Sequence, residues 1–177
     1  MAIVPDTKDW TWVLERPCPD CGFDCRAIRA DDVAALSREQ GEIWERFLAG
    51  HGDVRVRPSD DRWSVLEYTC HVRDVFRLAD ERVRLMVTED HPTFTNWDQD
   101  ATAVTDHYDT QDPALVATEV RAAAEALASR LDSVDREAWS RSGTRSDGAR
   151  FTVDSFARYV IHDPIHHVFD VTGDRPM

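Results

Sequence analysis

Residues 152–173 read TVDSFARYVIHDPIHHVFDVTG, and this stretch decides the fold. Its apolar residues recur every three or four positions, which is the period of one face of an α-helix. Thr152 is a suitable N-terminal cap and Gly173 a suitable terminator, so the pattern predicts one helix over the whole stretch. Pro164 removes one backbone hydrogen bond inside it, so we expect a kink or local strain there. The apolar stripe comprises Val153, Phe156, Val160, Pro164 and Val171.

Three further segments carry the same helical period. The second of them opens with Ser64 and Glu67 in the S-x-x-E pattern of a capping box. The third opens with Asp112 as a cap and Pro113 at the first helical position. Four helices of about 18–25 residues with almost no strand signal predict an all-α fold, a four-helix bundle. The three segments cover residues 31–50, 64–88 and 112–131.

The remaining residues form irregular segments around this bundle. Residues 1–29 are a leader that contains several prolines and three of the four cysteines. Residues 89–112 are acidic and rich in turn formers, and a connection this long in a small domain is usually functional. A length of 177 residues suits one domain, so we expect a single domain over 1–177 with its bundle at 30–173.

Charge and hydropathy exclude several classes of protein. The chain has 21 Lys and Arg against 34 Asp and Glu, a net charge of -13. Nucleic-acid binding needs a basic face, so we expect no nucleic-acid partner. No apolar run reaches the ~18 residues of a membrane span, and the N-terminus resembles no secretory signal. We therefore expect a cytoplasmic protein with a small-molecule substrate, and a homodimer as the commonest assembly.

The histidines suggest a metal site. His162 and His166 are four residues apart, so on a helix their rings project side by side and can share one metal. His71, in the middle of the second predicted helix, is the natural third ligand. Three histidines and an open position are typical of a catalytic site. Imidazole suits zinc, with nickel or iron as alternatives, so the cofactor is expected to be a divalent metal ion, zinc first.

Two alternatives to this ligand set remain open. His167 is also available and is paired at four residues with Asp163, on the opposite face of the last helix. We place it in ordinary packing, so replacing His71 should weaken metal binding strongly and replacing His167 far less. A lone mid-helix histidine such as His71 is also compatible with a core residue bonded to a backbone carbonyl.

The leader contains a second candidate site. Cys18, Cys21 and Cys25 lie in PCPDCGFDC, and the C-P-x-C-G turn suits two thiolates on one metal. We predict a possible second zinc site at these three cysteines, completed by Cys70 or a histidine. A redox pair and ordinary reduced cysteines are the alternatives.

Two motifs together resemble a known family. RWSVLEYTCHVRDV at 62–75 resembles the second-helix signature of the DinB/YfiT-like metalloenzymes, and YVIHDPIHHVFDV at 159–171 resembles their last helix. The resemblance covers about residues 30–173. It implies an up-down-down-up bundle with His71, His162 and His166 as the metal ligands.

The resemblance implies a bacterial enzyme that uses a small thiol, and the residues leave two other activities open. The first is a transferase that joins a low-molecular-weight thiol, such as mycothiol, to a small electrophile through a metal-activated thiolate. The second is a metal-dependent hydrolase in which Glu67 or Asp74 is the catalytic base. The third is a non-catalytic protein that binds a metal or ligand. Trp97 and Arg158 are the candidate substrate-binding residues, the first by stacking and the second by pairing with a carboxylate.

Overall fold

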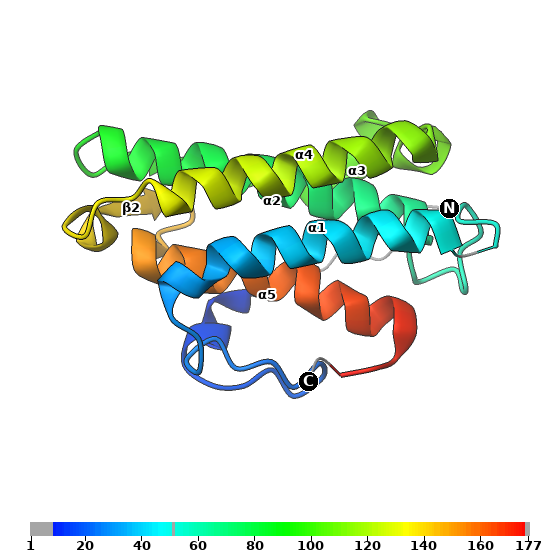
Figure 1. Cartoon of the computed structure of the whole chain (residues 1–177), viewed down its shortest axis with the longest axis horizontal. Helices are drawn as coiled ribbons and strands as arrows, with labels where there is room; N and C mark the ends of the chain where they lie inside the picture. Colours follow the sequence, from blue (N-terminus) through cyan, green and yellow to red (C-terminus); the bar gives the residue numbers. More distant parts are fainter. Residues whose placement is uncertain (1–8, 51, 176–177) are drawn as a thin grey trace.

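The computed structural model describes residues 9–50 and 52–175, and within them four long helices form a bundle (Figure 1). Helices α1 and α5 run in one direction along the long axis, and α2 and α4 run in the other (Figure 1). The predicted all-α four-helix bundle is confirmed, with the up-down-down-up order. The four helices are α1 (Val33–Gly50), α2 (Val65–Thr88), α4 (Pro113–Asp132) and α5 (Val153–Thr172).

Capping boxes fix where two of these helices begin. At the start of α2, the Glu67 backbone N–H donates to Ser64 Oγ at 3.2 Å, and the Ser64 N–H donates to Glu67 Oε2 at 2.9 Å. Thr152 and Ser155 make the equivalent reciprocal pair at the start of α5. Each box satisfies backbone N–H groups that have no partner inside the helix. Gly173 ends α5 with φ at +75°, a left-handed conformation that favours glycine.

The bundle packs tightly around its long axis. Helix α4 packs on α1 and α2, and α5 closes the bundle against the same two helices. Gly41 permits close contact between α1 and α4, because a Cβ added to it would lie 2.8 Å from the Ala124 Cβ. Trp44 is fully buried and donates from Nε1 to the Pro164 carbonyl at 3.2 Å. Helix α5 continues through Pro164 without interruption.

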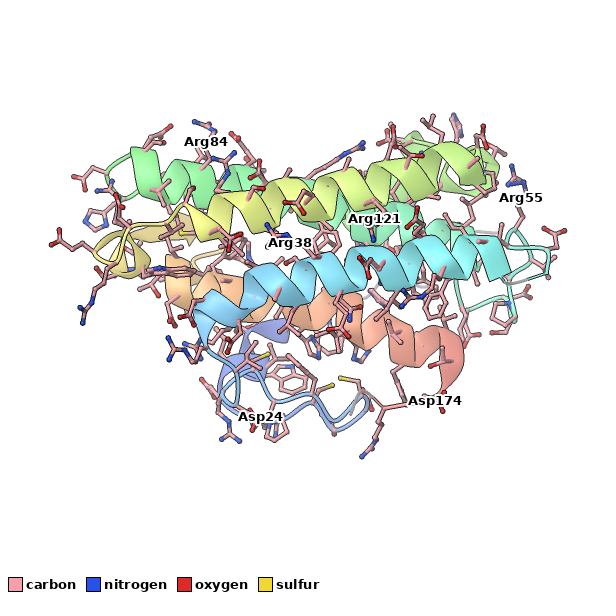
Figure 2. The ribbon with its side chains drawn as sticks, viewed as in Figure 1. Asp24, Arg38, Arg55, Arg84, Arg121 and Asp174 are labelled. Atoms are coloured by element: carbon pink, nitrogen blue, oxygen red, sulfur yellow. The ribbon has the colours of Figure 1, made fainter. Side chains whose placement is uncertain are left out.

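The outer surfaces of α1 and α4 carry many charged side chains, among them Arg38 and Arg121 (Figure 2). Arg38 pairs with Glu125 and with Asp132, each at 2.8 Å. These groups are largely exposed, so each pair contributes about 0–1 kcal/mol to stability. We assign them to the solvated surface.

A small three-stranded sheet lies at one end of the bundle and was not predicted from the sequence. Strand β1 (Thr93–Phe94) pairs in parallel with β2 (Ser142–Arg145), which pairs antiparallel with β3 (Arg150–Thr152). The strands are two to four residues long, too short to give an alternating pattern. Gly143 is required in β2, because an added Cβ would lie 2.7 Å from Phe94 and 2.9 Å from Met86.

The 89–112 segment and the leader both contain short helices or strands that contact the bundle. Residues 89–112 connect the end of α2 to the start of α4, and because these two helices are parallel the segment runs back along the bundle. It contains β1, helix α3 (Gln99–Thr105) and the 3-10 helix η3 (Tyr108–Thr110). In the described part of the leader, the 3-10 helix η1 (Trp10–Leu14) packs on α5, and so does the 3-10 helix η2 (Ala30–Asp32), which follows the leader and precedes α1. Residues 1–8 of the predicted leader lie outside the described residues. No helix in the described ranges is long and apolar enough to cross a membrane.

Candidate metal centres

Helix α5 carries two pairs of metal-ligating side chains at the i, i+4 spacing, offset from each other by one residue. A step of one residue rotates a side chain by about 100° around a helix, so the two pairs face different neighbours. Among the described residues, each pair forms a group with side chains from another segment, and the ligand atoms within each group lie within 4.8 Å of one another. The groups are His71, Asp163 and His167, and Cys18, Cys21, His162 and His166.

The first group, which we term the cavity site, joins α2 to α5. His71 Nε2 lies 3.1 Å from Asp163 Oδ1, and His167 Nε2 lies 3.7 Å from the same oxygen. Zinc bonds of about 2.0–2.2 Å in a tetrahedron hold N and O ligand atoms about 3.4 Å apart. The separations therefore suit three ligands of one tetrahedral metal ion.

The surroundings of the cavity site hold its rings in place. Asp170 Oδ2 lies 2.8 Å from His167 Nδ1, which leaves Nε2 of that ring to face Asp163. Trp97 stacks on His71 with 5.3 Å between ring centroids and 7° between planes. His71 is fully buried, and its Nδ1 has no hydrogen-bond partner among the described groups, so packing orients this ring.

Electrostatics keep the Asp163 carboxylate in its ligand form. Burial acts to raise the pKa of Asp163, but His71 and His167 outweigh it, and the pKa falls well below its ordinary value. The group therefore offers an anionic oxygen between two imidazole nitrogens.

A cavity of about 830 Å³ opens onto these side chains. Its wall includes Asp163 and His167, together with Trp97 and two almost fully buried arginines, Arg82 and Arg145. Arg145 pairs with Asp147 at 2.8 Å. Arg82 donates to the Thr95 carbonyl at 2.8 Å, but no described carboxylate lies within 4.0 Å of its guanidinium and its Nε has no partner.

The charge of Arg82 is consequently unbalanced at close range. Burial, and then the neighbouring Arg145, lower the pKa of Arg82 to about 10, so the group stays protonated at neutral pH. A buried cation without a carboxylate costs free energy that a bound anion can offset.

The second group, which we term the leader site, joins the leader to α5. Cys18 Sγ lies 3.5 Å from His166 Nδ1, and Cys21 Sγ lies 3.7 Å from His162 Nε2. Burial raises the pKa of Cys21 to about 12 and lowers the pKa of His162 to about 4. Without a cation, Cys21 is therefore a neutral thiol beside the neutral imidazole of His162.

The predicted ligand set is not brought together. His71 groups with Asp163 and His167, whereas His162 and His166 face the leader. The expectation that His167 belongs to ordinary packing is corrected, because α5 turns this residue toward α2, where its ring lies 5.0 Å from that of His71. Of the predicted cysteines, Cys18 and Cys21 join His162 and His166, while Cys25 is buried outside the group.

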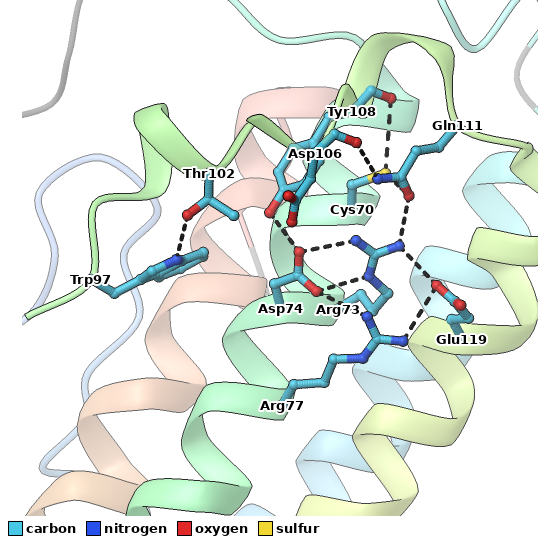
Figure 3. A network of polar contacts seen from close by, with 10 residues as sticks. All are labelled: Cys70, Arg73, Asp74, Arg77, Trp97, Thr102, Asp106, Tyr108, Gln111 and Glu119. Atoms are coloured by element: carbon cyan, nitrogen blue, oxygen red, sulfur yellow. Dashed lines mark hydrogen bonds and ion pairs between the residues drawn. The ribbon is translucent and has the colours of Figure 1, made fainter. Parts of the chain in front are cut away.

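The two predicted catalytic bases have structural partners instead. Glu67 belongs to the capping box of α2 and pairs with Arg57. Asp74 accepts from Arg73 Nε at 2.9 Å and from the Tyr108 hydroxyl at 2.6 Å, in a network between α2, α4 and the 89–112 segment (Figure 3). Neither residue lines the cavity.

The two predicted substrate-binding residues have different outcomes. Trp97 lines the cavity, and its Nε1 donates to Thr102 Oγ1 at 2.8 Å. Arg158 bonds to Asp154 one turn earlier and is not part of the cavity wall.

Sequence reasoning missed Arg82, and it predicted a zinc site in the leader without identifying His162 and His166 as the partners of Cys18 and Cys21. Arg82 sits in an ordinary helical pattern, and no signal in the sequence marks it. The leader site had a usable signal, because C-x-x-C and H-x-x-x-H both fall within the usual spacings of Cys₂His₂ zinc sites. The two motifs lie 141 residues apart, counted from Cys21 to His162, which hides the pairing.

Comparison with known proteins gives a family and two similar folds. A family model described as the DinB superfamily matches residues 35–169. YfiT from Bacillus subtilis, described as a probable metal-dependent hydrolase with an unusual four-helix bundle topology, aligns with a TM-score of 0.70 and 18% identity, over 82% of this chain and 88% of its own. A mycothiol-dependent maleylpyruvate isomerase aligns with a TM-score of 0.64 and 13% identity, over 86% of this chain and 66% of the isomerase chain. No curated protein matches the sequence significantly.

Proposed function

The chain belongs to the DinB superfamily, and from this premise we propose that it is a metal-dependent enzyme acting on a small anionic molecule. In this proposal His71, Asp163 and His167 hold a divalent metal, zinc first. The observation that carries it is the convergence of two imidazoles and one carboxylate from two facing helices, with Asp163 and His167 on the wall of an 830 Å³ cavity and His71 buried beside them.

The donor set fits such an ion. Two histidines and one carboxylate are a recurring three-ligand set of catalytic zinc sites, which keep a fourth position for water or substrate. A divalent metal bound there would lower the pKa of a coordinated thiol or water and so supply a nucleophile near neutral pH. Asp170 would hold His167 in the tautomer that offers Nε2, and Trp97 would fix the ring of His71.

The class of substrate follows from Arg82. This guanidinium is 6% exposed, lines the same cavity and has no carboxylate within ion-pairing distance among the described residues. Guanidinium groups bind carboxylates and phosphates with paired hydrogen bonds. A substrate with an anionic group would supply the missing partner and be oriented by it toward the cavity site.

Thiol transfer is the reaction that we propose first. The two bases predicted for hydrolysis, Glu67 and Asp74, do not line the cavity, and Asp170 already accepts from His167, so we place hydrolysis second. A thiol loses its proton on binding a metal and needs no such base. The cavity also exceeds the space that one small electrophile requires. Fold similarity to a mycothiol-dependent isomerase is compatible with this proposal.

Hydrolysis is the second candidate. Two histidines and a carboxylate also form the zinc site of several hydrolases, and YfiT, which shares the fold, is described as a probable metal-dependent hydrolase. A protein that binds a metal or ligand without turnover is the third.

One experiment separates the three. Untagged protein with one zinc equivalent at the cavity site is incubated with an anionic electrophile, with and without mycothiol, bacillithiol or glutathione, and products are identified by mass spectrometry. A parallel set contains carboxylate-bearing esters and amides without thiol. We expect a thioether or a thiol-dependent isomer that does not form with His71→Ala. Thiol-independent cleavage would replace this proposal by hydrolysis, and tight zinc binding without any product would indicate a binding protein.

The role of Arg82 gives a separate prediction. Arg82→Gln should raise KM for the anionic substrate about tenfold to a hundredfold and change kcat less, since a hydrogen bond to a charged group contributes about 1.5–3 kcal/mol. An uncharged analogue should show no such difference between variant and wild type. Arg84→Gln, on an exposed position of the same helix, is the control. Equal KM changes for the charged and uncharged compounds would contradict anion binding by Arg82.

A further inference from the structure

We propose that Cys18, Cys21, His162 and His166 bind a second zinc ion, in a structural site that fastens the leader to α5. This inference does not rest on the proposed function, because it concerns other side chains and another face of the helix. The four ligand atoms lie within 4.8 Å of one another.

The distances suit zinc closely. Zinc–sulfur bonds of about 2.3 Å and zinc–nitrogen bonds of about 2.0–2.1 Å in a tetrahedron place sulfur and nitrogen about 3.6 Å apart. The structure has 3.5 Å between Cys18 Sγ and His166 Nδ1, and 3.7 Å between Cys21 Sγ and His162 Nε2. Two independent sulfur–nitrogen pairs, from segments more than 140 residues apart in the chain, thus both have the spacing of a tetrahedral site.

The chemistry of the ligands points to a structural site. Cys₂His₂ sets fill all four positions of zinc, whereas catalytic sites keep one position open. Cys18, Cys21 and His162 are at least nine-tenths buried, and the His166 side chain is 11% exposed. Figure 2 shows sulfur atoms between the leader and α5. Soft thiolate ligands favour zinc over magnesium, calcium or manganese.

The backbone of the leader is shaped for this role. The Gly22 N–H donates to the Cys18 carbonyl at 2.8 Å, and the Cys18 N–H donates to the Phe23 carbonyl at 2.9 Å, so the chain turns back on itself around both sulfurs. Gly22 has φ at +82°, a conformation that favours glycine. The turn therefore presents Cys18 and Cys21 together toward one face of α5.

The site also has a consequence for the cavity. Trp10 and Asp20 of the leader belong to the cavity wall, and the Trp10 ring lies 5.1 Å from that of His166. A segment with few helical contacts of its own needs another anchor to stay in place. The zinc ion would supply that anchor and so hold one wall of the cavity.

Metal content measured by plasma mass spectrometry tests the proposal. We expect two zinc equivalents in the wild-type protein and one in Cys18→Ser/Cys21→Ser. The matched control is Cys25→Ser, since Cys25 is fully buried in the same leader but outside the group, and it should keep both equivalents. His71→Ala/His167→Ala should also keep one equivalent, because it removes only the cavity site. If only the cysteine double variant loses a zinc equivalent, the leader site stands and the cavity site fails. If only the histidine double variant loses one, the reverse holds.

X-ray absorption at the zinc edge covers the case in which the cysteine variant does not fold. In folded His71→Ala/His167→Ala, the remaining zinc should have two sulfur neighbours at about 2.3 Å and two nitrogens at about 2.0–2.1 Å. The proposal is overturned if no sulfur neighbour is present, if Cys18→Ser/Cys21→Ser keeps both equivalents, or if freshly purified protein holds a Cys18–Cys21 disulfide and no zinc there.

Discussion

Replacing His167 with alanine is expected to abolish turnover and to weaken zinc binding at the cavity site by about a hundredfold or more. His167 is one of three protein ligands there, and its Nδ1 is the atom that contacts Asp170. Four-ligand zinc sites bind with roughly 10–16 kcal/mol, which is about 3 kcal/mol for each ligand. A loss of that size corresponds to about two orders of magnitude in affinity.

The adjacent residue gives the decisive comparison for this prediction. His166→Ala should remove zinc from the leader site and leave the affinity of the cavity site within a few-fold of wild type, although His166 is next in sequence. The zinc affinities of both sites are measured by competition with a chromophoric chelator. Turnover is measured with the best substrate found for the wild-type protein. His107→Asn is the control, because His107 is exposed and its backbone φ of +50° is one that asparagine tolerates. Full turnover by His167→Ala would contradict the assignment of the cavity site.

The helices could be predicted from the sequence to within one or two residues. Ser64 with Glu67, and Asp112 with Pro113, mark starts that the structure confirms. Here local hydrogen bonds and the apolar period indicate the same boundaries. Helix α3 and the sheet could not be predicted, because contacts such as those of Gly143 with Phe94 and Met86 hold these short elements in place.

The candidate site was only partly predictable, for a geometric reason. The period of a helix shows that His162 and His166 share a face and that Asp163 and His167 share another. It does not show which face meets α2, since apolar residues flank both pairs. The packing of α5 on α2 and of the leader on α5 shows this in the structure, and a segment without periodicity gives no signal of where it docks.

The same geometry explains how one helix can serve two metals. His162 and His166 meet the leader, while Asp163 and His167 meet His71 of α2. The centroids of the His166 and His167 rings lie 5.8 Å apart. Asp170 Oδ2 lies 3.8 Å from His166 Nε2 and 2.8 Å from His167 Nδ1. Both pairs line the cavity, so a structural ion at the first pair would also fix the rotation of α5 that positions the second pair in the cavity wall.

Asp74→Ala is expected to lower the free energy of unfolding by about 1–3 kcal/mol without removing zinc from the folded protein. Asp74 is the carboxylate that Arg73 and Tyr108 share, and the Arg73 side chain is only 5% exposed (Figure 3). Without Asp74, Arg73 keeps the Glu119 carboxylate at 2.8 Å, but its Nε and the buried Tyr108 hydroxyl lose their acceptor. A buried donor left unsatisfied costs about 1–3 kcal/mol. Urea denaturation monitored by circular dichroism measures the change.

The pH dependence of this stability has a defined sign. Burial acts to raise the pKa of Asp74, but hydrogen bonds from Arg73 and Tyr108 outweigh it, and the pKa lies below its ordinary value. The unfolded carboxyl titrates near its ordinary value of about 3.9, so the stabilisation is complete above that pH and is lost as the pH falls below it. The difference between wild type and Asp74→Ala should therefore be constant at neutral pH and shrink below about pH 4.

An exposed pair and an activity measurement distinguish this structural role from a catalytic one. Glu81→Gln breaks the largely exposed pair with Arg84 on the same helix and should cost less than about 1 kcal/mol. Asp74→Ala should keep its turnover per folded molecule, because Asp74 does not line the cavity. If turnover falls by orders of magnitude while the free energy of unfolding stays unchanged, Asp74 acts as a base after all. In that case the 89–112 segment must move during the reaction, because Tyr108, which now covers Asp74, lies within it.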